Sequence, residues 1–176
     1  MGLQLIFCLE TNSVSKTDYI YIKQTIEHFY PNYDRSFVRL SPLYMNGKGN
    51  YSVPKTQKKI NNLISQFKAV ESANKNIVIF CFDCDDYDTN SDDKKFLEDA
   101  ANYCKNNGYI FVWFCKEIES VYLGKRVPDS DKTKEANSFV KNQRIKTIDE
   151  NQLRMVKYKD KCSNLCSILD KYLLSK

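Results

Sequence analysis

Histidine is almost absent from this sequence, which has only His28 among its 176 residues. This scarcity argues against mechanisms that need two histidines and against zinc sites built from several histidines. His28 falls in a segment with helical periodicity, at a phase opposite Ile22 and Ile26, and we expect it on the exposed face of a helix. The candidate chemistry therefore rests on other side chains.

Long apolar runs are also lacking. No stretch approaches the roughly 20 apolar residues that a membrane-spanning helix needs. The first ten residues, MGLQLIFCLE, have no positively charged region and reach Glu10 after too short an apolar run for a signal peptide. No internal repeat, low-complexity tract or linker interrupts the chain. We expect a soluble, cytoplasmic protein with no membrane partner.

Cysteine is frequent, with seven residues, but its pattern favours neither disulfides nor structural zinc. Cys81 and Cys84 form a C-x-x-C pair, yet no second pair stands at zinc-finger spacing. Cys162 and Cys166 are four residues apart in a helical pattern, which suggests a core face. Three cysteines lie inside apolar, strand-like runs: Cys8, Cys81 and Cys115. All seven are predicted to be reduced thiols that pack as small hydrophobic side chains.

The length and charge distribution fit one globular domain with two parts. Residues 1–124 carry 14 Lys and Arg against 15 Asp and Glu, whereas residues 125–176 carry 13 against 7. The net positive charge therefore lies entirely in the last third. We expect an α/β core over 1–124 and a basic helical extension over 125–176 packed on that core. An acidic centre beside a basic flank suits a polyanionic substrate.

Apolar runs and helical periodicities alternate along the core. Predicted strands cover Leu3–Leu9, Ser36–Leu40, Ile77–Phe82 and Tyr109–Cys115, and predicted helices cover Thr17–Tyr30, Lys55–Ser72 and Asp92–Asn107. Ser41–Val53 and Gly124–Lys134 are interpreted as loops, with helices over Glu135–Lys146, Ile148–Lys157 and Lys159–Leu174. The alternation predicts a doubly wound, mostly parallel four-stranded sheet with helices on both faces and a helical C-terminal extension.

The helix expected over Lys55–Ser72 begins with an unusual concentration of positive charge. Lys55, Lys58 and Lys59 all lie in its first turns. Cations at a helix N-terminus oppose the macrodipole, so an anion nearby would stabilise this arrangement.

Acidic residues follow three of the predicted strands. The run NIVIFCFDCDDYD ends in acids, and Asp83 and Asp85 would share one side if the backbone stayed extended between them. Glu10 follows the first strand, and Glu117 and Glu119 follow the fourth. Parallel strands bring their C-terminal ends to one edge of the sheet, so these carboxylates are expected to meet there. Converging carboxylates repel each other unless a cation such as Mg²⁺ lies between them.

These motifs resemble the Toprim fold, which has a glutamate after its first strand and an Asp-x-Asp signature after a later one. Glu10 and Asp83-Cys84-Asp85 carry the resemblance, and Thr11 stands where Toprim proteins usually have glycine. The segment KEIESVYLG, with Glu119, is similar to the extra glutamate element of stand-alone Toprim-like and OLD-type phage-defence nucleases. The tail YKDKCSNLCSILDKYL is similar to their C-terminal Ser-Asn helix.

The resemblance implies a Mg²⁺- or Mn²⁺-dependent nuclease acting on DNA or RNA in bacterial antiviral defence. Glu10, Asp83, Asp85 and Glu119 would hold the metal, and Glu10 is alternatively a general base. A lysine from the tail, Lys157, Lys159 or Lys161, would contact the leaving side, with Lys159 the preferred candidate. The implied partners are nucleic acid, a defence protein such as an ATPase, and a second copy of the chain.

Two other functions fit parts of the sequence. Asp83-x-Asp85 after an apolar strand also fits a HAD-type phosphatase or phosphotransferase, in which an aspartate is the nucleophile. That family usually carries the motif on its first strand. A Toprim-like subunit that binds nucleic acid or a partner through its basic C-terminal third, without catalysis, is the third alternative, and Thr11 in place of glycine is consistent with it.

Overall fold

The computed structural model describes residues 1–174 and shows an α/β fold. The strands are β1 (Leu3–Leu9), β2 (Val38–Tyr44), β3 (Lys75–Asp83) and β4 (Ile110–Phe114). The α-helices are α1 (Thr17–Phe29), α2 (Pro54–Val70), α3 (Ser91–Asn106), α4 (Ile118–Leu123), α5 (Asp129–Lys141) and α6 (Leu165–Leu173). Three short 3₁₀ helices complete the described elements: η1 (Lys48–Asn50), η2 (Arg144–Thr147) and η3 (Glu150–Leu153).

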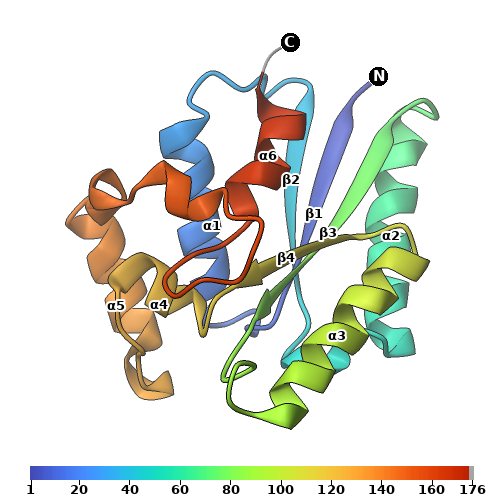
Figure 1. Ribbon diagram of the computed structural model, residues 1–176. Coiled ribbons are helices and arrows are strands. Elements are labelled where there is room, and N and C mark those ends of the chain that lie inside the picture. The colour runs from blue at the N-terminus through green and yellow to red at the C-terminus, as the bar shows by residue number, and fades with distance from the viewer. Residues whose placement is uncertain (175–176) are drawn as a thin grey trace.

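All four strands are parallel and lie in the order β2-β1-β3-β4. Helices α2 and α3 cover one face of the sheet, and α1, α4, α5 and α6 lie on the other (Figure 1). The predicted doubly wound parallel sheet is thereby confirmed. The strands run away from the end of the molecule where both termini lie, so their C-terminal ends form the opposite edge (Figure 1).

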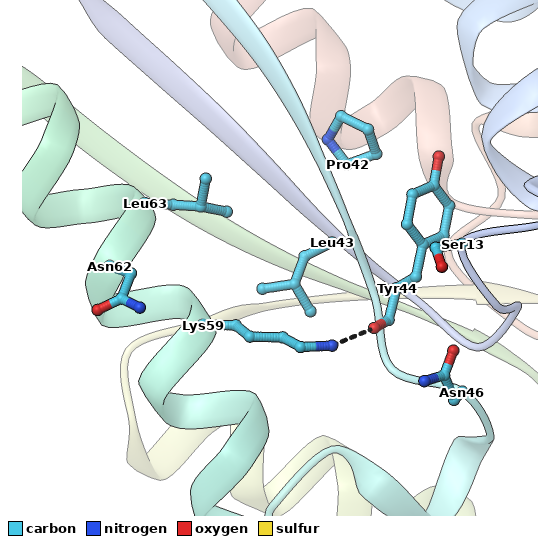
Figure 2. Close-up of a pocket in the computed structure, with 8 residues that line it drawn as sticks. All are labelled: Ser13, Pro42, Leu43, Tyr44, Asn46, Lys59, Asn62 and Leu63. Atoms are coloured by element: carbon cyan, nitrogen blue, oxygen red, sulfur yellow. Dashed lines mark hydrogen bonds between the residues drawn. The ribbon is translucent and has the colours of Figure 1, made fainter.

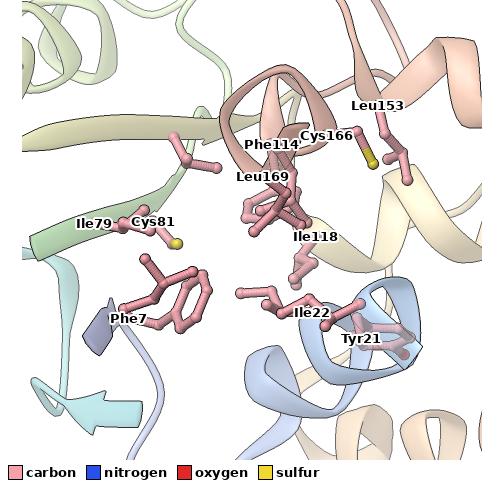
Figure 3. Packing of buried hydrophobic residues seen from close by; sticks show 14 of the residues in the cluster. Phe7, Tyr21, Ile22, Ile79, Cys81, Phe114, Ile118, Leu153, Cys166 and Leu169 are labelled. Carbon is pink, nitrogen blue, oxygen red and sulfur yellow. The ribbon is translucent and has the colours of Figure 1, made fainter. Parts of the chain in front are cut away.

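The sheet is held by a hydrophobic core on each face. Every residue of β1 is buried, because neighbouring strands flank it on both sides and helices cover both faces. Phe7 and Ile79 face α1 and α6, where they pack with Phe114 and Leu169 (Figure 3). Residues of the opposite parity, such as Phe80, form the second core beneath α2 and α3. This two-sided burial explains why the strands have continuous apolar runs.

The second strand differs from the prediction. A strand over Ser36–Leu40 followed by a loop over Ser41–Val53 was expected, but β2 extends from Val38 to Tyr44 and only the remainder forms a loop with the turn η1. Pro42 misled the prediction, since proline is rare inside sheets. Here β2 is an edge strand, where a proline without an N–H is tolerated.

The C-terminal third also differs in detail. Helix α5 begins at Asp129 rather than Glu135, because Pro128 precedes a first turn rich in acids. Only η3 is helical within the predicted Ile148–Lys157 segment, and α6 begins at Leu165 rather than Lys159. The residues before α6 are used in contacts with the edge strand β4 instead. Cys162 accepts a hydrogen bond of 2.9 Å from the amide of Cys115.

Side chains from the C-terminal third of the chain complete the edge of the sheet and the core. The Asn164 side chain accepts a bond of 3.0 Å from the Trp113 amide and donates one of 3.1 Å to the Phe111 carbonyl. Ala136, Phe139 and Leu165 belong to the core shared with the sheet. Residues 125–174 are therefore packed against the rest of the chain.

Two further expectations concern single residue types. His28 is exposed on α1, as predicted. All seven cysteines are free and buried, as predicted. Within residues 1–174, no helix is both long and apolar enough to cross a membrane.

Candidate functional site

Glu10 lies immediately after β1 and is fixed by two backbone contacts. Its Oε1 accepts a hydrogen bond of 3.0 Å from the amide of Asp83, at the end of β3. Its carbonyl accepts one of 2.7 Å from the amide of Gly47. Gly47 has φ 119°, a conformation that favours glycine, so the chain after β2 can close against Glu10. The carboxylate is thus held at the junction of three strand ends.

Asp83, the last residue of β3, connects this junction to α4. Its Oδ1 accepts a hydrogen bond of 2.9 Å from the amide of Ile118, the first residue of α4. The segments after β1, β3 and β4 are therefore joined through two carboxylates, Glu10 and Asp83. The predicted meeting of acidic strand ends is present for these two residues.

Asp85 lies elsewhere, and its predicted alignment with Asp83 is wrong. Strand β3 ends at Asp83, and Asp85 has φ 47° while its amide donates to the Lys116 carbonyl at 2.7 Å. The backbone does not stay extended, so the period of two no longer applies. The Asp85 carboxylate instead forms an ion pair with Lys48, which also contacts Asp93 at 3.1 Å.

Glu119 lies in the first turn of α4 and is completely buried, with 0% of its side chain exposed. Neither carboxylate oxygen has a hydrogen-bond partner among the described residues. The nearest cation is Lys132 of α5, whose Nζ lies 3.7 Å from Glu119 Oε2 and 3.7 Å from Glu117 Oε2. Glu117 is also 3.5 Å from Arg126. Glu119 is therefore the less compensated of these two glutamates.

Two residues of the site were not predicted from the sequence. Asp18, in the first turn of α1, accepts a hydrogen bond of 3.3 Å from the amide of Thr11. An acid at the start of a helix is ordinary, so the sequence offered no specific signal for it. Lys132 lies in the segment that was interpreted as a loop. Recognising Pro128 as a helix start would have placed Lys132 in the first turn of α5.

A cavity of about 520 Å³ lies at the C-terminal edge of the sheet, and Asp85, Glu117 and Glu119 are not among the residues that line it. Its lining includes Glu10, Asp18, Asp83 and Lys132. We call this cavity the acidic pocket. Its position matches the general rule that open parallel sheets bind ligands beyond the carboxyl ends of their strands.

The pKa values reflect an excess of buried carboxylates. Burial raises the pKa of Glu10 to about 8 and that of Glu119 to about 7. Burial also raises the pKa of Asp83 and Asp18, and the neighbouring carboxylates add to the effect on Asp83. Burial lowers the pKa of Lys132, but Glu119, Asp83 and their neighbours raise it by more. The pocket is lined by four acids, Glu10, Asp18, Asp83 and Asp129, and by one lysine, Lys132, so it favours protons or an added cation.

The fit of this pocket to Mg²⁺ or Mn²⁺ is chemical rather than geometric. Such ions prefer oxygen donors, and the pocket offers the carboxylates of Glu10, Asp18 and Asp83. The unpartnered oxygens of Glu119 lie beside Lys132, outside the lining of the pocket. In residues 1–174, however, no three His, Cys, Asp or Glu side chains already converge as a ligand group. Glu10 and Asp83 are partly engaged by backbone amides, and Asp85 is paired with Lys48.

The tail lysines are placed differently from the acids. Lys157, Lys159 and Lys161 are exposed on the segment between η3 and α6 and do not line the acidic pocket. Lys132 is the cation that the structure places within it.

Comparison with known proteins gives no relative. No protein-family model, no curated protein and no solved structure matches this chain.

Proposed function

We propose that this chain is a Mg²⁺- or Mn²⁺-dependent nuclease that hydrolyses phosphodiester bonds in DNA or RNA. The observation that carries the proposal is the hydrogen bond between Glu10 and the Asp83 amide, at the rim of a pocket that holds Asp18 and Lys132. Glu119, buried and without hydrogen-bond partners, adds a further carboxylate beside Lys132. Toprim-like nucleases, which the sequence resembles, use a glutamate and paired aspartates for the same chemistry. Here Glu10 and Asp83 line the pocket, whereas Asp85 pairs with Lys48 outside it.

In this proposal Glu10, Asp83 and Glu119 hold the metal, with Asp18 beside them. The bound ion would lower the pKa of a coordinated water and neutralise charge that develops on the phosphate. Glu10 is alternatively the general base, and in that role its ionised carboxylate would take the proton of the attacking water. Attack on phosphorus breaks the ester bond to the leaving oxygen, which then takes up a proton. Lys132, in the same pocket, neutralises a phosphate oxygen.

Two observations bear on the alternative functions. A HAD-type phosphotransferase needs both aspartates of Asp83-x-Asp85 at one phosphate, but the Asp85 carboxylate pairs with Lys48, which also contacts Asp93. A subunit that only binds nucleic acid has no use for unpartnered buried carboxylates, which repel phosphate unless a cation is bound. A cytoplasmic role in bacterial antiviral defence, with an ATPase partner or a second copy of the chain, follows from the resemblance and belongs to the proposal.

The test is cleavage of single- and double-stranded DNA and RNA with EDTA, Mg²⁺ or Mn²⁺. Wild type should cleave at least one substrate only with metal, whereas Glu10→Gln and Asp83→Asn should not. Asp99→Asn is the matched control, because Asp99 is an exposed acid on α3, outside the pocket. Equal activity in all four proteins, or metal-independent activity, would contradict the proposal. A trapped phosphoaspartate would favour the phosphotransferase instead.

A further inference from the structure

Helix α2 carries positive charge that the protein itself does not compensate. The helix contains four lysines, Lys55, Lys58, Lys59 and Lys68, and no acidic residue. None of these lysines takes part in an ion pair within residues 1–174. Three of them lie in the first two turns, where the helix dipole disfavours cations. A bound anion would pair with these lysines and would also offset their unfavourable interaction with the helix dipole.

A second cavity, of about 300 Å³, lies between this helix and the edge strand β2. Leu43 and Leu63 point toward each other across the gap, and Asn62 lies beside them on α2 (Figure 2). Lys59 extends across the cavity and donates a hydrogen bond of 3.1 Å to the Tyr44 carbonyl (Figure 2). We call this cavity the edge pocket. It combines apolar walls, an amide and a cation, which suits a ligand with a flat apolar ring and an anionic group.

The edge pocket adjoins the acidic pocket. Asn46 lines both cavities, and the loop after β1 contributes Ser13 to the first and Ser15 to the second. A chain of linked anionic units could therefore lie with one unit in each pocket. Lys55, Lys58 and Lys59 lie in the first turns of α2, and Lys59 also lines the edge pocket.

We propose that the edge pocket binds one nucleotide of a single-stranded nucleic acid, next to the phosphodiester in the acidic pocket. This assignment rests on the proposed nuclease function and specifies the substrate class. The base contacts Leu43 and Leu63, the Asn62 amide binds the base edge, and Lys58 and Lys59 contact the phosphates. A duplex is disfavoured, because its bases are stacked and paired and cannot enter a pocket of this kind.

The test measures binding without cleavage. Fluorescence anisotropy in Ca²⁺, a cation that also binds oxygen ligands and neutralises the acidic pocket, compares a labelled twelve-nucleotide single strand, as DNA and as RNA, with its duplex. Wild type should bind the single strand more tightly than the duplex. The double variant, Lys58→Gln with Lys59→Gln, should weaken binding about tenfold. It should also lower the slope of log K against log salt concentration by about the amount expected for two lost phosphate contacts. Lys68→Gln, which removes one charge at the far end of α2, is the control and should change the affinity less than twofold.

A second variant separates a nucleotide pocket from general electrostatic attraction. Asn62→Ala keeps all charges and should reduce the difference in affinity between oligonucleotides of different base composition, with the salt dependence unchanged. Equal weakening by Lys68→Gln and by Lys58→Gln with Lys59→Gln would overturn the assignment. Tighter binding of duplex, or binding of a mononucleotide as tight as that of the oligonucleotide, would also overturn it. Anisotropy reports binding and not cleavage, so a protein that binds the single strand but shows no cleavage with Mg²⁺ or Mn²⁺ would contradict only the proposed function.

Discussion

The carboxylate of Glu10 accepts its hydrogen bond from the backbone amide of Asp83, 73 residues later in the chain. The contact joins the ends of the two central strands, β1 and β3. Because the donor is a backbone amide, the orientation of Glu10 does not depend on the side chain at position 83. Charge and geometry at Glu10 can therefore be separated by mutation.

Glu10→Gln should abolish metal-dependent cleavage while the fold is retained. Glutamine keeps an oxygen that can accept the Asp83 amide, but it loses the charge that binds metal and the capacity to take a proton. We expect activity to fall at least about 100-fold, within the range for loss of a general base. Glu10→Ala should lose activity equally and also lose about 1 kcal/mol of unfolding free energy, since the amide loses its partner. Cleavage assays with urea denaturation check this, and an active Glu10→Gln would remove Glu10 from the mechanism.

The unfolding free energy in EDTA should fall as pH rises from about 4.5 to 8. In the unfolded chain, glutamates lose their protons near pH 4.5, whereas in the folded protein burial raises the pKa of Glu10 to about 8 and of Glu119 to about 7. The folded state thus binds more protons in this window, and its stability decreases as they are lost. Melting temperatures across the window measure the effect.

Two comparisons make this pH prediction specific. Glu10→Gln and Glu119→Gln should each flatten the decline, whereas Asp99→Asn should not. Added Mg²⁺ should raise the melting temperature more at pH 8 than at pH 5, because metal binds the ionised carboxylates. A melting temperature that rises between pH 4.5 and 8 in EDTA would contradict the assigned burial of these acids.

Lys132→Met should destabilise the protein in EDTA at pH 8 by about 2 kcal/mol. The substitution leaves the buried Glu119 carboxylate without its nearest cation, a situation that is costly in protein interiors. In the double variant with Glu119→Gln, most of that loss should disappear, which gives a coupling energy of about 1 to 2 kcal/mol. Lys125→Met is the control, because Lys125 pairs with Glu135 at the surface and should contribute less than about 0.5 kcal/mol. Denaturation of the four proteins of the cycle tests whether the two residues interact.

Asn164→Ala should cost about 1 to 3 kcal/mol of unfolding free energy. The side chain satisfies the Trp113 amide and the Phe111 carbonyl on the outer edge of β4, and alanine leaves both without a partner. Asn61→Ala, an exposed substitution on α2, should change stability by less than about 0.5 kcal/mol. Urea denaturation compares the two, and similar values for both would show that the tail does not stabilise the sheet edge.

The elements of the core could be predicted because their sequence patterns are strong. The apolar runs of β1 and β3 and the periodic faces of α1, α2 and α3 give correct types and nearly correct bounds. Errors occurred where tertiary contacts override a local pattern. Pro42 is tolerated because β2 lies at an edge, and the residues before α6 pair with β4 instead of extending the helix.

The sequence by itself determined that this protein is a parallel α/β sheet whose strand ends carry acids, because hydrophobic periodicity and the position of carboxylates are local properties. Only the tertiary structure decided which acids meet. It joined Glu10 to Asp83, turned Asp85 toward Lys48, and brought Asp18 and Lys132 into the same pocket. The reason is physical: backbone torsion after a strand and the packing of helices from distant segments set side-chain directions, and neither is encoded in the spacing of residues along the chain.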